Sequence, residues 1–450
     1  MSLVVSARVM QTPAADHLQV IDDALIAVDD NGLITAVETA GSEAGLSLLR
    51  PGTDRFVSPP GTVLIPGLVD LHVHAPQWPQ LGTGLDLPLE RWLFEYTFPL
   101  EARYADLAFA RSVWTDLVDG LLRHGTTTAT YFATIDLDAT SALASTAADA
   151  GQRAFVGRVA MDHPDGTPEW YRDPSAEAGV LASARSIDEI VAIDAGRGLV
   201  RPVVTPRFTP ACTDDLLRGL GRLAATTGAL VQTHCSESDW AHRYALDRFG
   251  TSDTSALDAF GLLRSGTVLA HADHVTDADA GLIRARGAGI AHCPLSNAYF
   301  ANAVLPVRRL VESGVRVGLG TDVAGGASPG LLHQAHDAVT VSRLLRDGVD
   351  RARPPSERGV PGSAIDATYA FWLATRGGAS VLGIPVGLLA PGYRFDAVLV
   401  DTASRRGSMR VWPGIDSAER TFEKLVRLAS PVDIVGVWVD GKRVVGDPVG

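Results

Sequence analysis

Between residues 64 and 385, the sequence repeats a short apolar segment followed by a longer amphipathic one eight times. The short segments are rich in β-branched residues, which is typical of buried strands, and the longer ones space their apolar residues as helices do. Eight strand–helix units in about 320 residues predict a (β/α)₈ barrel of the TIM type. The alternative is an open, doubly wound sheet, but no G-x-G-x-x-G turn follows the first strand.

The expected barrel strands share an apolar body and a polar carboxyl end. They cover residues 64–71, 125–133, 153–162, 199–208, 229–237, 267–274, 288–296 and 315–323. The clearest helices between them are expected at residues 105–125, 139–151, 180–197 and 213–228, the last with Thr213 as its N-cap.

Both ends of the chain have a different texture, with short β-type runs separated by Asp-, Asn- and Gly-containing turns. Asp440 and Gly441, for example, predict a hairpin turn near the C-terminus. We expect residues 1–64 and 386–450 to form one composite β-sandwich domain beside a barrel of residues 65–385. The alternative is a pair of unrelated β appendages.

The composition limits the kinds of binding partner and the cellular compartment that we expect for this protein. Hydrophobic residues make up 46% of the chain and its formal net charge is -13, which argues against nucleic acid or an anionic membrane as a partner. Three cysteines without C-x-x-C spacing favour a reducing compartment. The N-terminus lacks a signal-peptide pattern, and no apolar segment reaches the ~20 residues of a membrane span. We expect a cytoplasmic protein.

Two histidines stand one residue apart at the end of the first expected barrel strand, His72 and His74. Residues i and i+2 of a strand project on the same face, so the two imidazoles point toward one place. Such a pair suits a divalent ion, zinc first. The alternative is a pair of polar groups hydrogen-bonded to a loop, because H-x-H is a short motif.

Active sites of these barrels lie at the carboxyl ends of the strands. The later strand ends carry Arg207, His234, Glu237, His271, His292 and Asp322. Three neutral imidazoles, from His72, His74 and His234, together with the Asp322 carboxylate leave Zn²⁺ or Fe²⁺ with room for a water, whose pKa would fall from ~16 toward ~7. Considered alone, His234 could also be a buried core histidine with its hydrogen bonds satisfied, and Asp322 could cap the segment that follows it. The role of His292 stays open.

The fourth strand ends in Thr205, Pro206, Arg207 and Phe208 and contains no lysine, the residue that commonly bridges two metals in such barrels, so one metal is favoured. The Arg207 guanidinium could donate to a carbonyl oxygen while the Phe208 ring packs on a flat face. A surface arginine beside a core phenylalanine is the alternative. Glu237 follows His234 by three residues, where a proton shuttle would be needed.

The chain resembles the amidohydrolase superfamily and, within it, the family of guanine deaminases. The resemblance extends along nearly the whole chain in the order of that family and includes PGLVDLHVHAPQ, GLDLPLERWLFEYTFPLE, TTTATYFATI, QRAFVGRVAMD, TPRFTPACTDDLL, THCSES, AHADHV, IAHCPLSN, GLGTDVAGG, GYRFDAVLVD and VWVDGKRVV. HAPQ followed by the LDLPL…WL…YTFPLE run is far more specific than H-x-H alone.

This resemblance implies hydrolytic deamination of guanine to xanthine and ammonia, a step of purine breakdown or salvage. It also implies that His72, His74, His234 and Asp322 hold one zinc ion, with His271 close to the water on that ion. Barrels of this type often pair, so we expect a homodimer that acts on a small purine and water.

The resemblance further assigns roles around the substrate. Asp322 would accept the proton of the water as hydroxide attacks carbon 2, and Glu237 would shuttle a proton to a ring nitrogen. Arg207 would hold the purine carbonyl oxygen, Phe208 would pack near the ring and Gln77 would bond to a ring edge.

Three stretches depart from the family pattern. Ser238 stands where asparagine is usual, and the residues after Asn297 and after Ala327 also differ. They lie in loops that build specificity, so a pterin, an oxidised guanine such as 8-oxoguanine, or a triazine stays an alternative substrate. A hydrolase of a ring amide or a carbon–halogen bond and a non-catalytic scaffold are the other classes. Residues 87–101 would either roof the pocket or face a partner.

Overall fold

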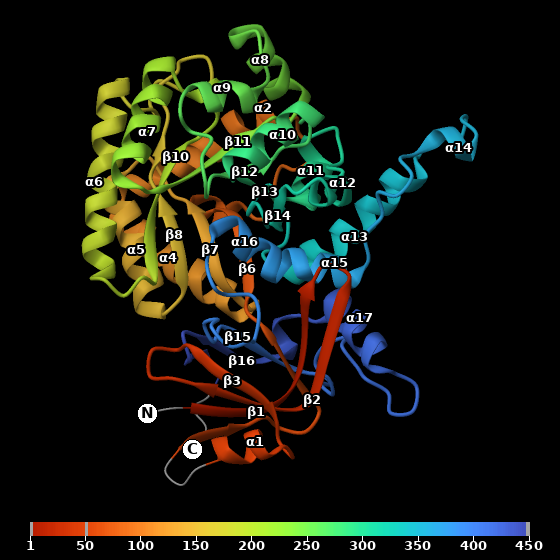
Figure 1. Ribbon diagram of the computed structural model, residues 1–450. Coiled ribbons are helices and arrows are strands. Elements are labelled where there is room, and N and C mark those ends of the chain that lie inside the picture. Colours follow the sequence, from red (N-terminus) through yellow and green to blue (C-terminus); the bar gives the residue numbers. More distant parts are fainter. Residues whose placement is uncertain (1–2, 50–52, 447–450) are drawn as a thin grey trace.

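The computed structural model describes residues 3–49 and 53–446, which form a parallel barrel above a smaller sheet built from both termini (Figure 1). Eight parallel strands follow one another around the barrel, and the two-residue β9 pairs with β10 beside them. The strands are β6 (Leu68–His74), β7 (Thr126–Phe132), β8 (Arg153–Gly157), β9 (Val159–Ala160), β10 (Val200–Pro206), β11 (Leu230–Cys235), β12 (Val268–His271), β13 (Gly289–His292) and β14 (Arg316–Leu319). The predicted barrel is confirmed.

The first and last barrel strands meet just beyond the end of β14. The Asp322 amide donates to the His72 carbonyl at 2.8 Å, and the His74 amide donates to the Val323 carbonyl at 3.0 Å. Below them, the buried Asp70 carboxylate accepts hydrogen bonds from the amide and the hydroxyl of Thr321. These bonds close the barrel at the level where the expected site residues stand.

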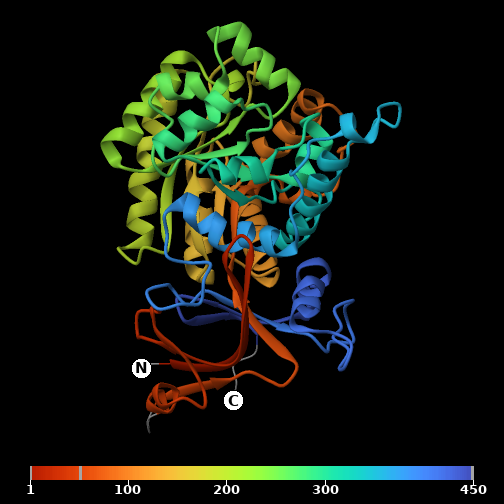
Figure 2. The ribbon, with the colours of Figure 1, turned by 45° about the vertical axis from the view of Figure 1, so that its right-hand side comes forward.

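Helices surround the barrel (Figures 1 and 2). The Thr213 hydroxyl accepts from the Leu216 amide and caps α7, as expected from the sequence. The outer helices are α4 (Leu107–Arg123), α5 (Leu137–Ala150), α6 (Ala176–Asp194), α7 (Asp214–Thr227), α8 (Asp239–Phe249), α9 (Asp253–Ala259), α10 (Asp277–Arg286), α11 (Pro294–Phe300), α12 (Val307–Glu312), α13 (Leu331–Asp347), α14 (Pro355–Arg358), α15 (Ala367–Trp372) and α16 (Gly378–Leu382). Among the described residues, no helix combines the length and apolarity that crossing a membrane requires.

The segment between β6 and α4 is helical as well. It contains η1 (Ala75–Gln80), α2 (Leu89–Trp92), the π-helical turn η2 (Leu93–Thr97), α3 (Phe98–Glu101) and η3 (Ala102–Ala105). Beside the barrel, α13 and α14 project from the body as an arm (Figures 1 and 2).

The smaller sheet joins the two ends of the chain, because β5 from the N-terminal part pairs with β15 from the C-terminal part. Its strands are β1 (Leu3–Ala14), β2 (His17–Val28), β3 (Ile34–Thr39), β4 (Asp54–Val57), β5 (Thr62–Pro66), β15 (Ala397–Asp401), β16 (Ile434–Val439) and β17 (Lys442–Val445), accompanied by α1 (Glu43–Leu48), α17 (Ala418–Leu428) and the short η6 (Pro431–Asp433). A separate composite domain is therefore confirmed, while its expected boundaries after residue 64 and before residue 386 stay predictions.

The hairpin turn between β16 and β17 has the predicted chemistry. Asp440 and Gly441 both adopt positive φ, 47° and 75°, as the two central residues of a type I′ turn require. Both residues tolerate this conformation, aspartate because it hydrogen-bonds locally and glycine because it has no Cβ.

Candidate active site

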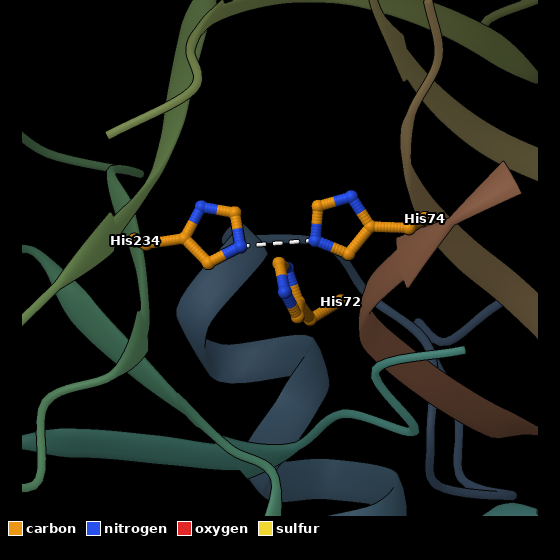
Figure 3. A group of neighbouring side chains, drawn as sticks. All are labelled: His72, His74 and His234. Atoms are coloured by element: carbon orange, nitrogen blue, oxygen red, sulfur yellow. Dashed lines mark hydrogen bonds between the residues drawn. The ribbon is translucent and has the colours of Figure 1, made fainter. Parts of the chain in front are cut away.

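His72, His74 and His234 converge above the ends of β6 and β11 (Figure 3). His72 and His74 are separated by one residue of β6 and their rings meet edge to face, with centroids 4.8 Å apart. His74 comes from β6 and His234 from β11, and their Nε2 atoms lie 2.9 Å apart. The strand periodicity that predicted one shared face for His72 and His74 holds in the structure.

The protonation of these imidazoles follows from their surroundings. The Nδ1 atom of His234 donates to the Arg207 carbonyl oxygen at 2.6 Å, so its Nε2 carries the lone pair that faces His74. Both ring nitrogens of His72 are buried without a hydrogen-bond partner. Burial lowers the pKa of all three histidines well below the usual value, and neighbouring cationic groups lower it further. Neutral imidazole is the form that binds a metal ion.

Asp322 completes this cluster from beyond β14. Its Oδ1 lies 3.1 Å from His72 Nε2 and 3.6 Å from His74 Nε2, and its Oδ2 lies 3.9 Å from His271 Nε2. Asp322 and His271 both adopt left-handed backbone conformations, with φ of 50° and 68°. Side chains other than glycine reach this region at a cost, and such strain concentrates at functional sites. Burial raises the pKa of Asp322, while His271 opposes that rise.

Glu237 and His271 face each other beside the three histidines, with Glu237 Oε1 3.5 Å from His271 Nε2. The His271 Nδ1 bonds to the Asn297 side-chain oxygen at 2.8 Å, and the Asn297 amide donates to Asp273 at 2.8 Å. Burial raises the pKa of Glu237 well above its usual value, and the nearby Asp322 carboxylate adds to the rise. A carboxyl held in this way can carry a proton near neutral pH.

A small cavity opens directly onto the cluster. Its lining combines apolar and aromatic side chains with several converging polar groups, the combination that fixes a small molecule in one orientation. The lining residues are His74, Gln77, Trp92, Leu93, Arg207, Phe208, His234, Glu237, Phe300, Asp322 and Gly325. Gln77, Arg207 and Phe208, all expected from the sequence to meet a substrate, therefore share one wall region with the histidines. Residues 87–101 roof this cavity through Trp92 and Leu93.

Glu101 is a functional candidate that the sequence did not reveal. Its buried carboxylate accepts two hydrogen bonds from the Arg207 guanidinium, at 2.6 and 3.0 Å, and one from the Gln77 amide at 3.1 Å. The Arg207 guanidinium also lies over the Phe98 ring, 4.9 Å from its centroid. Glu101 stands in an aromatic-rich helical segment with no motif of its own. The YTFPLE run was the only signal that could have drawn attention to it.

The other histidines lie outside the cluster. His292 is buried at the end of β13, its Nδ1 has no hydrogen-bond partner, and burial lowers its pKa to about 3. Within the described residues, every group of three or more close metal-capable side chains is drawn from the site residues already named. The seven remaining histidines are half-buried or exposed: His17, His124, His163, His242, His274, His333 and His336.

The loops that depart from the family pattern lie around the cavity. Ser238 is buried and caps α8, because its hydroxyl accepts from the Ala241 amide, and it does not line the cavity itself. Phe300, from the stretch after Asn297, does line it, whereas the stretch after Ala327 contributes no lining residue. One of the three departing stretches therefore contributes directly to the shape of the pocket.

Residues 63–444 match the amidohydrolase family. A probable guanine deaminase of Schizosaccharomyces pombe is 36% identical over 98% of this chain and 82% of its own, and human guanine deaminase is 35% identical over 95% of this chain and 93% of its own. The crystal structure of guanine deaminase from C. acetobutylicum with bound guanine superposes with a TM-score of 0.86 at 27% identity, covering 98% of this chain and all of the other.

The fold and the match over most of its length make this chain a member of the amidohydrolase family, and within it of the guanine deaminases. The cluster of histidines and carboxylates can bind a metal ion, as the ligand chemistry of such barrels requires.

Proposed function

We propose that this protein hydrolyses guanine to xanthine and ammonia, using one zinc ion per chain. The observation that carries the proposal is the meeting of two different groups of residues on one small cavity. One group is the histidines and carboxylates, which are suited to activating water, and the other is Arg207, Gln77 and Phe208, which are suited to a flat ring with a carbonyl. The guanine deaminase relatives support the choice of guanine among aminated rings.

The residues present fit a zinc ion on their own chemistry. His72 buries two ring nitrogens without partners, and buried polar groups without partners destabilise a protein unless a ligand satisfies them. We assign His72, His74, His234 and Asp322 as the zinc ligands, with Fe²⁺ as the other ion that this donor set accepts. When bound, the ion would lower the pKa of water and make hydroxide available near neutral pH.

Recognition of the purine falls to Arg207, Phe208 and Gln77. Arg207 donates hydrogen bonds to the purine carbonyl oxygen, and Phe208 packs near the ring. Gln77 has its amide oxygen occupied by the Ala324 amide and one N–H occupied by Glu101, so its remaining N–H is free to bond to a ring edge. These contacts hold carbon 2 and its exocyclic amine toward the histidine cluster.

The two buried carboxyls move the protons. Glu237 donates its proton to ring nitrogen 3 while oxygen adds to carbon 2, so negative charge does not accumulate on the ring. Asp322 accepts a proton from the attacking water and passes it to the exocyclic amine. The carbon–nitrogen bond then breaks and ammonia leaves, and the hydroxyl on carbon 2 returns its remaining proton to Glu237 as the carbonyl of xanthine forms. Over the cycle, the two protons of one water end on nitrogen 3 and on ammonia. His271, facing both carboxyls, orients the water.

The proposal includes a homodimer in the cytoplasm. All three cysteines are buried and unpaired, which suits a reducing compartment. Light scattering on the purified protein tests the dimer, and a mass of one chain would exclude it.

Two measurements on a single preparation test the central proposal: metal content, and xanthine and ammonia release from guanine. About one zinc per chain with both products formed is the expected result. Zinc without turnover of guanine would contradict the substrate, and a panel of pterins, 8-oxoguanine and triazines would then be the next measurement. Active protein without zinc or iron would contradict the metal.

A further inference from the structure

Glu101 lies behind the cavity wall, not in it. It ends α3 and is 1% exposed, and its carboxylate contacts two residues that line the cavity, Arg207 and Gln77. A single buried carboxylate therefore links the two groups proposed to recognise the purine carbonyl and the ring edge.

The hydrogen bonds fix the orientation of both partners. The two Glu101 oxygens accept from the two terminal nitrogens of Arg207, a fork-to-fork pair that fixes the plane of the guanidinium. The Gln77 side chain is held at both ends, by Glu101 at its nitrogen and by the Ala324 amide at its oxygen. Without Glu101, the Gln77 amide could rotate and exchange its donor and acceptor.

The same carboxylate sets the charge of the wall. Burial disfavours a charged Arg207 and lowers its pKa, but the Glu101 carboxylate more than offsets this, so that the pKa is raised overall. Arg207 is 2% exposed and so stays cationic with little help from water. Together, Arg207 and Glu101 present hydrogen-bond donors to the cavity with no net charge.

We propose that Glu101 is a positioning residue that makes the wall of Arg207 and Gln77 select a neutral purine over an anionic one. This rests on the proposed function only in taking a purine as the ligand. Deamination replaces an amine by a carbonyl and leaves a more acidic ring, so a wall without net charge holds the product less firmly than a bare arginine would. Glu101 thereby favours release of the product as well as binding of the substrate.

Substitution of Glu101→Gln tests the proposal, because it keeps the size of the side chain and removes its charge. The probes are hypoxanthine, which is neutral at neutral pH, and urate, which is anionic there, with dissociation constants measured by titration calorimetry. Wild-type protein should prefer hypoxanthine. In Glu101→Gln, the ratio of the two constants should shift toward urate by about tenfold or more, because the Arg207 charge is no longer compensated.

Two further variants separate positioning from damage. Glu101→Asp keeps the charge but shortens the reach, so its urate-to-hypoxanthine ratio should stay near wild type while KM for guanine rises severalfold. Asp396→Asn removes a carboxylate from another buried, bidentate arginine pair, with Arg153 at the opposite end of the barrel, and should leave the ratio unchanged. Weakening of both probes by the same factor in Glu101→Gln would overturn the proposal, since a merely structural role predicts that result.

Calorimetry keeps this test independent of turnover. A shifted ratio in a protein that does not deaminate guanine would overturn the proposed function and leave the role of Glu101 standing. Normal deamination with an unchanged ratio would overturn the role of Glu101 alone. Wild-type protein that binds neither purine would overturn both.

Discussion

The two ends of the barrel both bury charged side chains, yet they satisfy them to very different degrees. At the base, Arg153 begins β8 and donates to both oxygens of Asp396, at 3.1 and 3.2 Å, and to Asp440 at 2.6 Å. The Asp440 amide in turn donates to Asp396 at 2.8 Å. Arg394 Nε also lies 3.7 Å from Asp440, so two arginines face two carboxylates. This network joins the barrel to the C-terminal strands of the small domain.

At the mouth, several buried groups are left without a hydrogen bond. Among the described residues, neither ring nitrogen of His72 nor the Nε2 of His271 makes one, and their close contacts are with carboxylates of the site itself, Asp322 at 3.1 Å and Glu237 at 3.5 Å. The backbone at His271 and Asp322 is held in a costly conformation besides. Charged groups that are fully paired, such as those at the base, stabilise the structure. Polar groups without hydrogen bonds, held in place by a strained backbone, are available to bind a ligand. The comparison predicts that substitutions at the mouth change activity and those at the base change stability.

The largest effect is expected from His72→Ala. The one close polar contact of its ring is with Asp322, a residue of the site itself, so the variant should fold, but its metal content should drop well below one ion per chain. Activity should fall by about 10³-fold or more, since the ion stabilises the transition state by several kcal/mol. Elemental analysis and xanthine formation are the measurements. Exposed His17 provides the control, His17→Ala. If His72→Ala kept its metal, the proposed difference between the mouth and the base of the barrel would be contradicted.

Glu237→Gln should follow in size. The amide cannot carry the proton to the ring, so kcat should fall roughly 10²-fold or more while the metal content stays near wild type. Steady-state kinetics with guanine, beside elemental analysis, measures both. Glu95→Gln on the outer side of the roof segment is the matched control, because its carboxylate is exposed and pairs only with Arg91. Near-normal turnover in Glu237→Gln would refute the role of Glu237 as a shuttle.

Asp396→Ala tests the base of the barrel. Removing one partner of a buried ion pair leaves Arg153 partly uncompensated, so the free energy of unfolding should fall by about 3–5 kcal/mol. Activity per folded molecule should stay within about twofold of wild type, because the network lies at the far end of the strands from the cavity. Urea unfolding and kinetics of the folded fraction measure the two quantities. If Asp396→Ala instead lost activity and kept the stability of the wild type, the base of the barrel would serve activity, contrary to the prediction.

A smaller, pH-dependent effect is expected at Asp253, which supports the mouth by accepting from the Ser236 amide at 2.9 Å. Burial raises its pKa from 3.8 to about 6. A carboxyl group whose pKa is higher in the folded than in the unfolded protein stabilises the fold when it is protonated. This stabilisation is complete at a pH below the pKa of the unfolded state and is lost as the pH rises through the pKa of the folded state. The contribution of Asp253 to wild-type stability should therefore decline by up to about 3 kcal/mol between about pH 4 and pH 6. Asp253→Asn should flatten that decline in urea unfolding, and an unchanged slope would contradict the assignment.

Local patterns in the sequence were enough to predict the barrel and the histidine cluster. A strand ending in H-x-H must direct both rings to one face, and the carboxyl ends of all strands meet at one mouth, so His72, His74 and His234 could be brought together without coordinates. Asp322 lies beyond the end of β14, which stops at Leu319, but the same reasoning reached it because the chain stays at the mouth.

Glu101 could not be found in this way. It lies in the helical segment of residues 87–101, which covers the mouth of the barrel with Trp92 and Leu93 facing the cavity. The path of this segment depends on tertiary packing, and no periodicity or spacing in the sequence predicts it. Its partner Arg207 was recognised from the strand end, but the charge that compensates it comes from a separate element. Pairings between distant elements are set by the tertiary fold.

The hydrogen bonds that join Asp322 to His72 and His74 to Val323 also govern when the site can form during synthesis. The chain makes β6 early and the Asp322 loop late, so a nascent polypeptide that has not yet released that loop lacks the carboxylate and has an open barrel. A truncated product ending before Asp322 would have two unsatisfied strand edges and no complete cluster, so it would be recognised as unfolded rather than accumulate as an apo-enzyme. With Asp322 among the proposed ligands, the full set of metal-binding side chains exists only in chains whose barrel is complete.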